Sequence, residues 1–209
     1  MTKEINLKAK NTPQLWVFLS ANIIFLIGLL FPVHFLELTK SFDIYLILKF
    51  VGVSIAPLVL FLLNGLLSSH IKAILVYWKL KHPLPGSTAF SKWSKSDHRV
   101  NRKKLKEIHG KLPKNTADQN RKWYEIYRKN SNNNIIQNSH RAFLLARDLT
   151  SLSVLFLIFL GIPVLILGSW PLNLFYNLVL ILQYLIICVN AKNRGVRFVT
   201  NVLAIESSS

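Results

Sequence analysis

The feature that most constrains this chain is a set of three long stretches without Asp, Glu, Lys or Arg. They are Asn11–Leu36 with 26 residues, Phe50–Ile71 with 22 and Leu149–Ala191 with 43, in a chain of 209 residues. A helix needs about 20 apolar residues to cross the hydrocarbon core of a bilayer. The first two stretches are each long enough for one crossing, and the third is long enough for two. The sequence therefore predicts an integral membrane protein.

A turn signal divides the third stretch into two spans. The segment Gly168–Asn173 reads Gly-Ser-Trp-Pro-Leu-Asn, and its Gly and Pro are strong breakers of regular structure. With one span in each of the first two stretches, the chain then has four transmembrane helices. The predicted spans are Gln14–Val33, Tyr45–Leu67, Thr150–Leu167 and Leu172–Val189.

Two alternatives to four membrane helices agree less well with the sequence. A helix at the edge of a soluble core keeps one polar face, whereas Val154–Leu167 has none. A cleaved signal peptide has an apolar core of about 7–15 residues, followed by small residues at the cleavage site. The first stretch is longer than that, and the bulky segment Phe31–Phe35 follows it. An uncleaved membrane anchor is therefore expected.

The distribution of basic residues predicts the orientation, because Lys and Arg near spans accumulate on the cytoplasmic side. The N-terminal tail carries three Lys residues, and Ser68–Asp148 carries 18 Lys and Arg against 5 Asp and Glu. The C-terminal tail carries Lys192, Arg194 and Arg197, whereas His34–Ile44 has a single Lys. We expect a multi-pass protein of the cell inner membrane, with both termini and the middle segment in the cytoplasm.

This topology divides the chain into three parts. Residues 1–81 hold the N-terminal tail, the first helical hairpin and a juxtamembrane helix. Residues 82–148 form a basic helical cytoplasmic domain, and residues 149–209 form the second hairpin and the C-terminal tail. The predicted fold is all-α, with four transmembrane helices and a small helical cytoplasmic domain between the second and third spans. Within that domain, caps and breakers predict the helices Arg102–His109, about fourteen residues from Thr116, and Ile135 onward into the third span.

The helix of the second span is expected to continue to Lys81. The segment His82–Gly86 then ends it, because its two prolines disfavour helical geometry. Four apolar residues between Ile71 and Trp78 share one face of this extension. The face suits the lipid headgroup zone, where Trp anchors and Lys meets anionic lipid. Packing on the cytoplasmic domain explains it equally well.

Polar residues within the spans indicate helix packing rather than transport. Charged groups deep in a span mark ion or proton paths, and here the only charge is Lys49, near a span end. Amides in spans usually form hydrogen bonds between helices. Together with the thin core of a cytoplasmic domain of this size, they predict a homo-oligomer. The amides are Asn22, Asn64, Asn173, Asn177 and Gln183.

The sequence contains no recognisable catalytic or metal-binding motif. Its six histidines lack the spacing of zinc ligands, and Cys188 is the only cysteine, so no metal and no cofactor are expected. Neither a phosphate-binding loop nor a nucleophile elbow occurs. We therefore predict no catalytic residue. The rival hypothesis is a membrane-bound enzyme that acts on lipid or nucleotide, with His82, Asp97, His98 or His140 as candidates.

Basic residues of the middle segment are the strongest binding signal. Arg99–Lys106 places five positive charges in eight residues, in a chain of net charge +17. Three negative partners fit this surface: anionic membrane lipid, a nucleic acid or nucleotide held by charge and aromatic stacking, or an acidic cytoplasmic protein. The residues predicted to bind a polyanion or partner are Arg99, Arg102, Lys103, Lys104, Lys106, Arg121, Lys122, Trp123 and Arg128.

Three segments of the middle part have a motif-like character: His82–Phe90, Gln119–Tyr127 and His140–Asp148. In its whole plan the chain resembles small bacterial four-span membrane proteins that accompany antiviral defence systems. The resemblance implies a membrane subunit that senses or responds through a cytoplasmic partner. The expected function is a non-enzymatic, oligomeric membrane effector or scaffold, whose basic cytoplasmic domain recruits an acidic ligand or partner. Besides the membrane-bound enzyme, an oligomeric channel is the second alternative to this function.

Overall fold

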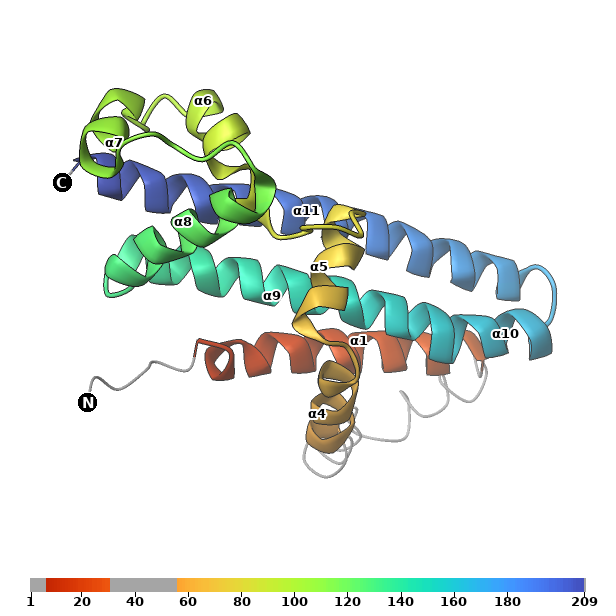
Figure 1. Ribbon diagram of the computed structural model, residues 1–209. Coiled ribbons are helices and arrows are strands. Elements are labelled where there is room, and N and C mark those ends of the chain that lie inside the picture. The colour runs from red at the N-terminus through yellow and green to blue at the C-terminus, as the bar shows by residue number, and fades with distance from the viewer. Residues whose placement is uncertain (1–6, 31–55, 209) are drawn as a thin grey trace. The chain divides into compact units, whose positions relative to one another are not determined.

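The computed structural model of the chain describes residues 7–30 and 56–208, and every element in these ranges is helical (Figure 1). The predicted all-α class is confirmed for this part of the chain. The elements, in order, are η1 (Ala9–Asn11), α1 (Thr12–Leu30), α4 (Ala56–Leu66), α5 (Ser69–Tyr77), η2 (Pro85–Thr88), η3 (Ala89–Trp93), α6 (Ser94–Ser96), α7 (Arg102–His109), α8 (Thr116–Lys129), α9 (Asn134–Phe156), η4 (Leu157–Gly161), α10 (Ile162–Leu167) and α11 (Leu172–Ser208).

The described residues divide into two compact units. The first comprises residues 7–8, 69–147 and 188–208, and the second comprises residues 9–30, 56–68 and 148–187. Helices α9 and α11 are continuous and contribute residues to both units. This division differs from the predicted parts, because residues 188–208 belong with the middle part of the chain and not with the second hairpin.

Three of the described helices are long and apolar enough to cross a membrane. They are Ala9–Leu29, Asn134–Leu167 and Leu172–Ser208, with 21, 34 and 37 residues. They correspond to the predicted first, third and fourth spans. About half of the predicted second span, Tyr45–Leu67, lies outside the described residues, and the helix described within it is α4, with 11 residues. A total of four spans therefore stays a prediction.

Polar side chains of the second unit find partners within the chain. Gln183 Nε2 donates to Asn22 Oδ1 at 3.1 Å, and Asn177 Nδ2 donates to the carbonyl oxygen of Gly161 at 3.0 Å. Asn173 likewise donates to a backbone carbonyl, at 3.2 Å. Unsatisfied amides were a reason to expect several copies of the chain. Because one copy satisfies these amides, that reason falls away, and the homo-oligomer stays a prediction.

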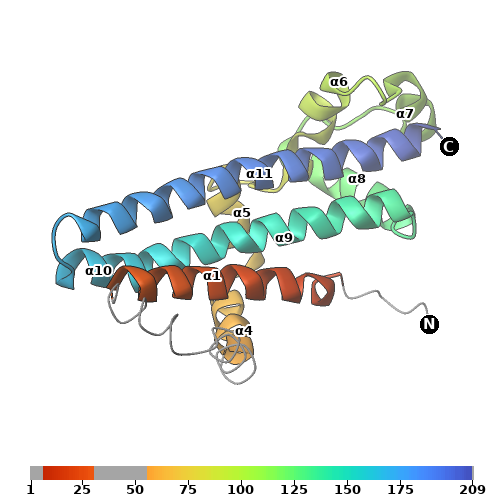
Figure 2. The ribbon, with the colours of Figure 1, turned by 180° about the vertical axis from the view of Figure 1, so that it is seen from behind.

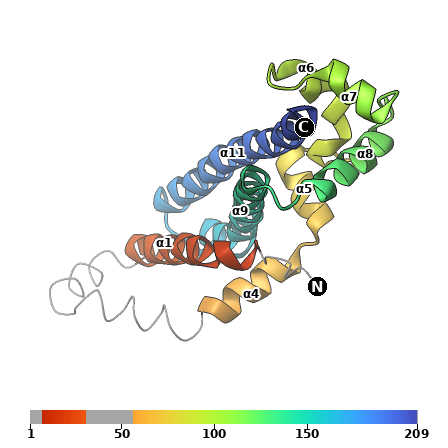
Figure 3. The same ribbon diagram turned by 90° about the vertical axis from the view of Figure 1, so that its left-hand side faces the viewer.

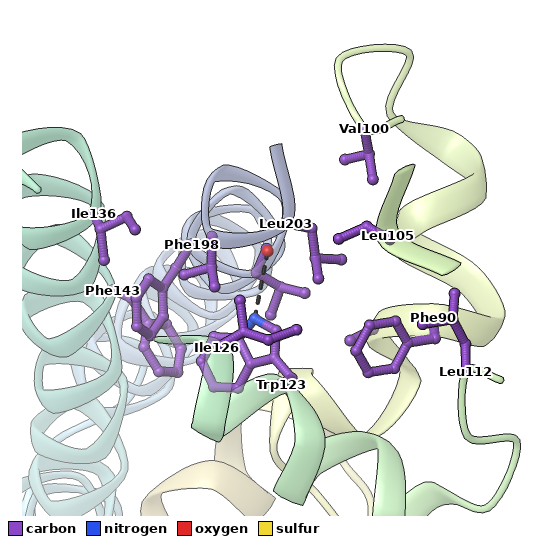
Figure 4. Close-up of a cluster of buried hydrophobic side chains, with 13 residues drawn as sticks. Phe90, Val100, Leu105, Leu112, Trp123, Ile126, Ile136, Phe143, Phe198 and Leu203 are labelled. Carbon is purple, nitrogen blue, oxygen red and sulfur yellow. Dashed lines mark hydrogen bonds between the residues drawn. The ribbon is translucent and has the colours of Figure 1, made fainter. Parts of the chain in front are cut away.

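The core of the first unit is built around the C-terminal half of α11 (Figure 4). Phe198, Val199, Val202 and Leu203 are all at most 4% exposed, and their spacing places them along one side of the helix. The segment predicted as a C-terminal tail is therefore the central core helix of this unit. The buried residues that pack in the same cluster include Phe90, Leu105, Trp123, Ile126, Ile136 and Phe143.

Two of the motif-like segments pack directly on each other. Gln119 Oε1 accepts hydrogen bonds from the backbone nitrogens of Phe90 and Ser91, at 3.0 and 2.9 Å. Gly86 lies so close to α8 that a Cβ atom there would come within 2.6 Å of the Trp123 ring. These contacts hold the short helical turns η2 and η3 against α8.

Helix α5 ends earlier than predicted. It stops at Tyr77, because Trp78 adopts a φ of 55° in the left-handed region, which breaks the helical repeat. Ala73 and Val76 are fully buried in the first unit, where Val76 packs with Ala191 of α11. Trp78 remains 60% exposed. One side of α5 is thus buried within the first unit, while the segment that follows α5 exposes apolar side chains.

Gly195 allows α11 to lie against the ring of Tyr77, because a Cβ atom at this position would overlap the Tyr77 hydroxyl. We expect Gly195→Ala to lower the melting temperature of the full-length protein in detergent, since overpacking a filled core costs about 1–3 kcal/mol. Adding Tyr77→Phe removes the overlapped hydroxyl and should restore part of the loss. The matched control is Gly65→Ala, where a Cβ atom meets nothing within 4 Å. Equal melting temperatures for Gly195→Ala and the wild type would contradict this packing.

Candidate functional site

Most of the residues predicted to bind a polyanion lie on or near α7, and local sequence explains why this helix forms. It spans Arg102–His109, as predicted. The side chain of Asn101 caps it by accepting a hydrogen bond from the backbone nitrogen of Lys104 at 3.1 Å. Gly110 ends it with a φ of 70°, which favours glycine. Leu105 is fully buried on the inner side of α7, whereas Lys103 and Lys106 are exposed and Arg102 and Lys104 are half-buried.

Helix α7 lies beside the C-terminal end of α11 (Figure 2), and a buried carboxylate of α11 anchors it there. The side chain of Glu206 is completely buried. Its Oε1 accepts hydrogen bonds from His109 Nε2 and Lys129 Nζ, both at 2.9 Å. Its Oε2 accepts from Asn130 Nδ2 at 2.6 Å. One carboxylate therefore joins the ends of α7, α8 and α11.

The electrostatics of this anchor favour the charged carboxylate. Burial alone raises the pKa of Glu206, but the hydrogen bonds from Lys129, Asn130 and His109 outweigh it and hold the pKa below its usual 4.5. Glu206 lies 15 residues past the charge-free part of α11. A buried charge is tolerated only where it is paired and hydrogen-bonded, so the three helix ends depend on one another. The neighbouring Ser207 adds a link, because its Oγ accepts from the backbone of the α7 cap residue at 3.1 Å.

Three of the nine predicted binding residues are paired with nearby carboxylates. Two hydrogen bonds from the Arg99 guanidinium hold the pKa of Asp97 well below its ordinary value. Exposed pairs of this kind contribute little to stability, about 0–1 kcal/mol, but they neutralise charge locally. The pairs are Arg99 with Asp97 at 2.7 Å, Arg121 with Asp118 at 2.9 Å and Lys122 with Glu125 at 3.2 Å.

The other basic residues of the predicted set have no carboxylate partner among the residues that the structure describes. Four of them belong to the eight residues of α7, and the only acid of that helix, Glu107, pairs with none of them. Helix α7 thus presents a cluster of unpaired positive charge. The residues without a carboxylate partner are Arg102, Lys103, Lys104, Lys106 and Arg128.

Trp123 does not lie on this surface. Its side chain is 6% exposed, it packs edge-on against Phe198 with ring centroids 5.1 Å apart, and it stacks on Tyr127 at 5.9 Å. Its indole nitrogen donates to the carbonyl oxygen of Val199 at 3.4 Å. The predicted role of Trp123 in binding a partner therefore has no support from its position. The exposed aromatic residue of α8 is Tyr124, at 51%.

No hydrogen bond or ion pair joins any two of the four candidates for catalysis in the described part of the chain. His140 stacks on Phe198 with ring centroids 4.6 Å apart, and its Nδ1 lies 3.0 Å from the hydroxyl of Tyr127. Figure 3 shows the N-terminal end of α9 beside the C-terminal part of α11, the helices that carry His140 and Phe198. Burial, together with the nearby Arg147, lowers the pKa of His140 to about 4. Asp97 is held by its arginine partner, and the other two histidines are exposed. His140 is therefore a half-buried side chain packed on Phe198, where its lowered pKa favours the neutral ring.

Across residues 7–30 and 56–208, no group of three or more His, Cys, Asp and Glu side chains could hold a metal ion. Cys188 is buried and forms no disulfide, and its thiol donates to the carbonyl oxygen of Val76 at 3.2 Å. A comparison of the chain with protein-family models, with curated proteins and with solved structures finds no match.

Sequence reasoning missed the residues that follow the predicted fourth span. Glu206 anchors α7, and Arg194 and Arg197 line a groove of about 300 Å³. A signal for them exists in the sequence. Between Phe198 and Leu203, apolar side chains recur at i, i+1, i+4 and i+5, a spacing typical of a helix with one buried face. This spacing indicates a packed helix and not a free tail.

We expect Glu206→Gln to destabilise the protein by roughly 1–3 kcal/mol at neutral pH, because a neutral amide loses charge-assisted hydrogen bonds. The folded-state pKa of Glu206 is lowered, so its carboxylate stabilises the fold above pH 4.5 and loses this effect as the pH falls through the folded-state value. The gap in melting temperature between wild type and variant should therefore close below pH 4.5.

Glu125→Gln is the control for this experiment, because it removes a carboxylate that is 56% exposed. Its melting temperature should stay within the range of an ordinary surface substitution, about 0.5 kcal/mol. A gap between wild type and Glu206→Gln that does not change with pH would show that the carboxylate charge is not what holds the three helix ends.

Proposed function

We propose that the chain is a non-enzymatic membrane subunit whose basic cytoplasmic unit recruits an acidic protein partner through α7. The observation that carries this proposal is the cluster of basic side chains on α7 that have no carboxylate partner among the described residues. The C-terminal end of α7 is anchored, so the cluster is held in place. The anchor is the carboxylate of Glu206 on α11, a helix that is long and apolar enough to cross a membrane. A charged surface joined to a membrane helix in this way is suited to recruitment.

The anchoring of α7 supports a specific binding surface. Its inner residue Leu105 is buried, its N-terminus is capped by Asn101, and its last residue, His109, is held by Glu206. A surface that is already ordered loses little conformational entropy when a partner binds. Ile108, at 43% exposed, adds an apolar contact point beside the basic side chains. Opposite charge on a partner would accelerate association and select the partner.

The placement of the aromatic residues favours a protein partner over a single-stranded nucleic acid. Binding of single strands combines positive charge with exposed aromatic rings on which bases stack. Trp123, the aromatic residue of the predicted binding set, is buried in the core. Trp93 is half-buried and is covered by Lys92, whose Nζ lies 4.4 Å from the ring centroid. This leaves the exposed ring of Tyr124 on α8, at 51%, as the stacking surface that these aromatic residues offer.

The proposed setting is the cytoplasmic side of the cell inner membrane, with the subunit present in several copies. The resemblance to membrane proteins that accompany antiviral defence systems would make the partner a soluble component of such a system. In that role the chain would act as an effector or scaffold that transmits the binding event to the membrane. The rival enzyme has less support, because no hydrogen bond or ion pair joins any two of its four candidate catalytic residues in the described part of the chain.

The cytoplasmic orientation predicts a pattern of thiol labelling in intact cells. In a Cys188→Ser background, an impermeant thiol reagent should label a cysteine placed at Ser41, which lies outside the described residues. It should not label a cysteine placed at Lys95 or Ser208, both of which are exposed in the structure. Permeabilised cells provide the control, because all three positions should then react. Labelling of Lys95→Cys or Ser208→Cys in intact cells, without labelling of Ser41→Cys, would reverse the topology.

Charge reversal on α7 tests the proposed recruitment surface. The triple variant Lys103→Glu, Lys104→Glu and Lys106→Glu should bind poly-L-glutamate at least about tenfold more weakly than the wild type, because three attractive charges become repulsive. The protein is used at full length in nanodiscs of phosphatidylcholine. Binding of the wild type should weaken as salt is raised, since salt screens exposed charges.

The matched control for this experiment reverses three exposed lysines outside α7: Lys95→Glu, Lys111→Glu and Lys114→Glu. It makes the same change in net charge and should retain most of the binding. Equal loss in both triple variants would show that net charge alone is responsible, and would overturn α7 as the binding surface. If a single-stranded oligonucleotide bound more tightly than poly-L-glutamate and depended on the same α7 residues, the partner would instead be a nucleic acid.

A further inference from the structure

An open groove of about 300 Å³ lies between α9 and α11 within the first unit. His140 stacks on Phe198 and Ala146 packs with Ala191, so the two helices run antiparallel here, as Figure 1 also shows. The groove is lined by successive turns of both helices and lies apart from α7. Its lining residues are Ile135, Asn138, Ser139 and Ala142 of α9, and Arg194, Arg197 and Asn201 of α11.

The lining of this groove is positively charged and includes no acidic residue. The Arg197 side chain makes no ion pair or hydrogen bond with any described residue, and Arg194 reaches only Asn190 Oδ1, through its Nε at 3.4 Å. Residues three apart on a helix project to the same side, so both guanidinium groups are available to one ligand. The amides of Asn138 and Asn201 add neutral donors beside them.

This combination of groups fits a phosphate. The planar guanidinium presents a fork of N–H donors that matches two oxygens of a phosphate group. Two such forks neutralise its negative charge, and amide donors can reach the remaining oxygens. Ile135 and Ala142 provide apolar surface at the same groove. A ligand with a phosphate group joined to an apolar part would therefore meet both kinds of lining.

The end of the groove at Arg194 lies at the depth of lipid headgroups, and the rest of the groove extends beyond it. Arg194 and Arg197 follow Ala191, the last residue of the charge-free stretch, by three and six residues. At 1.5 Å per residue this is roughly 5 and 9 Å along α11. On α9, Ala142 precedes Leu149 by seven residues, or roughly 10 Å. The polar zone of a bilayer extends roughly 5–8 Å beyond each side of the hydrocarbon core.

A second contact at this level of α11 has the character of a membrane interface. Lys192 Nζ lies 3.5 Å from the ring centroid of Trp78, and that ring is 60% exposed. Leu80, two residues further on, is 80% exposed. Exposed Trp and Lys side chains beside apolar surface are typical of the headgroup zone. This contact lies outside the groove and supports the depth assignment independently.

We infer that the groove between α9 and α11 is a binding site for the phosphate of an anionic lipid headgroup, with Arg194 and Arg197 as its charged ligands. The site is separate from α7, so it neither requires nor excludes recruitment of an acidic protein there. It would fix the first unit against the membrane surface and make its docking depend on anionic lipid.

Native mass spectrometry of the full-length protein in detergent tests this site. Phosphatidic acid should be retained at higher occupancy than phosphatidylcholine. Arg194→Gln with Arg197→Gln should lower the apparent affinity for phosphatidic acid by about tenfold or more, because the charge-assisted hydrogen bonds are lost. The matched control, Lys95→Gln with Lys114→Gln, removes the same charge from exposed positions outside the groove and should retain the lipid.

A second pair of variants separates a shaped site from general attraction to basic residues. Ala142→Leu adds bulk to the groove without changing charge and should also weaken lipid retention. Ala117→Leu, on the exposed side of α8, should not. Melting temperatures confirm that each variant is folded. Equal lipid retention by the wild type and both groove variants would overturn the site, as would equal loss in the lysine control. Displacement of the lipid by inorganic pyrophosphate at equal concentration would assign the groove to a soluble phosphate instead.

Discussion

The hydrogen-bonded carboxylate of Glu206 is the interaction on which the arrangement of the first unit depends. It joins the last turn of α7, the last turn of α8 and the residue that follows α8 to the end of α11. A carboxylate in a buried position is costly unless its charge is compensated. The three donors provide that compensation, and the positions of the helices that carry them are constrained in return. The orientation of α7 therefore depends on the contact between its last residue, His109, and Glu206.

The apolar second unit is constrained in a different way. In a membrane no water is available to satisfy polar groups, so they must find partners inside the protein. Asn22 and Gln183 bind each other, and Asn177 reaches the carbonyl oxygen of Gly161. Gly161 ends the π-helical turn η4, and a Cβ atom there would approach Asn177 Oδ1 to 2.7 Å. The absence of a side chain at this position is what allows the amide to make its bond.

Sequence patterns predicted the local structure of the middle part well. Helix α7 has the predicted bounds, and α8 begins at Thr116 with the expected length of fourteen residues. Asn101 and Gly110 are caps whose effect extends over one turn of chain, so they can be read without tertiary information. The burial of the Trp123 side chain could not be predicted in this way. An aromatic side chain on a half-apolar helix serves equally as core or as an exposed platform, and the packing of Phe198 against it decides which.

The sequence by itself determined that the chain is helical and apolar enough for a membrane, because the length of a charge-free stretch is a local property that can be counted in the sequence. It also determined which segment carries the excess of basic residues. Tertiary structure alone decided that residues 188–208 are a core helix, that Glu206 holds α7, and that Arg194 and Arg197 share a groove with α9. Each of these pairs residues far apart in the chain. The free energy of such contacts depends on burial and geometry, which no local pattern of residues contains.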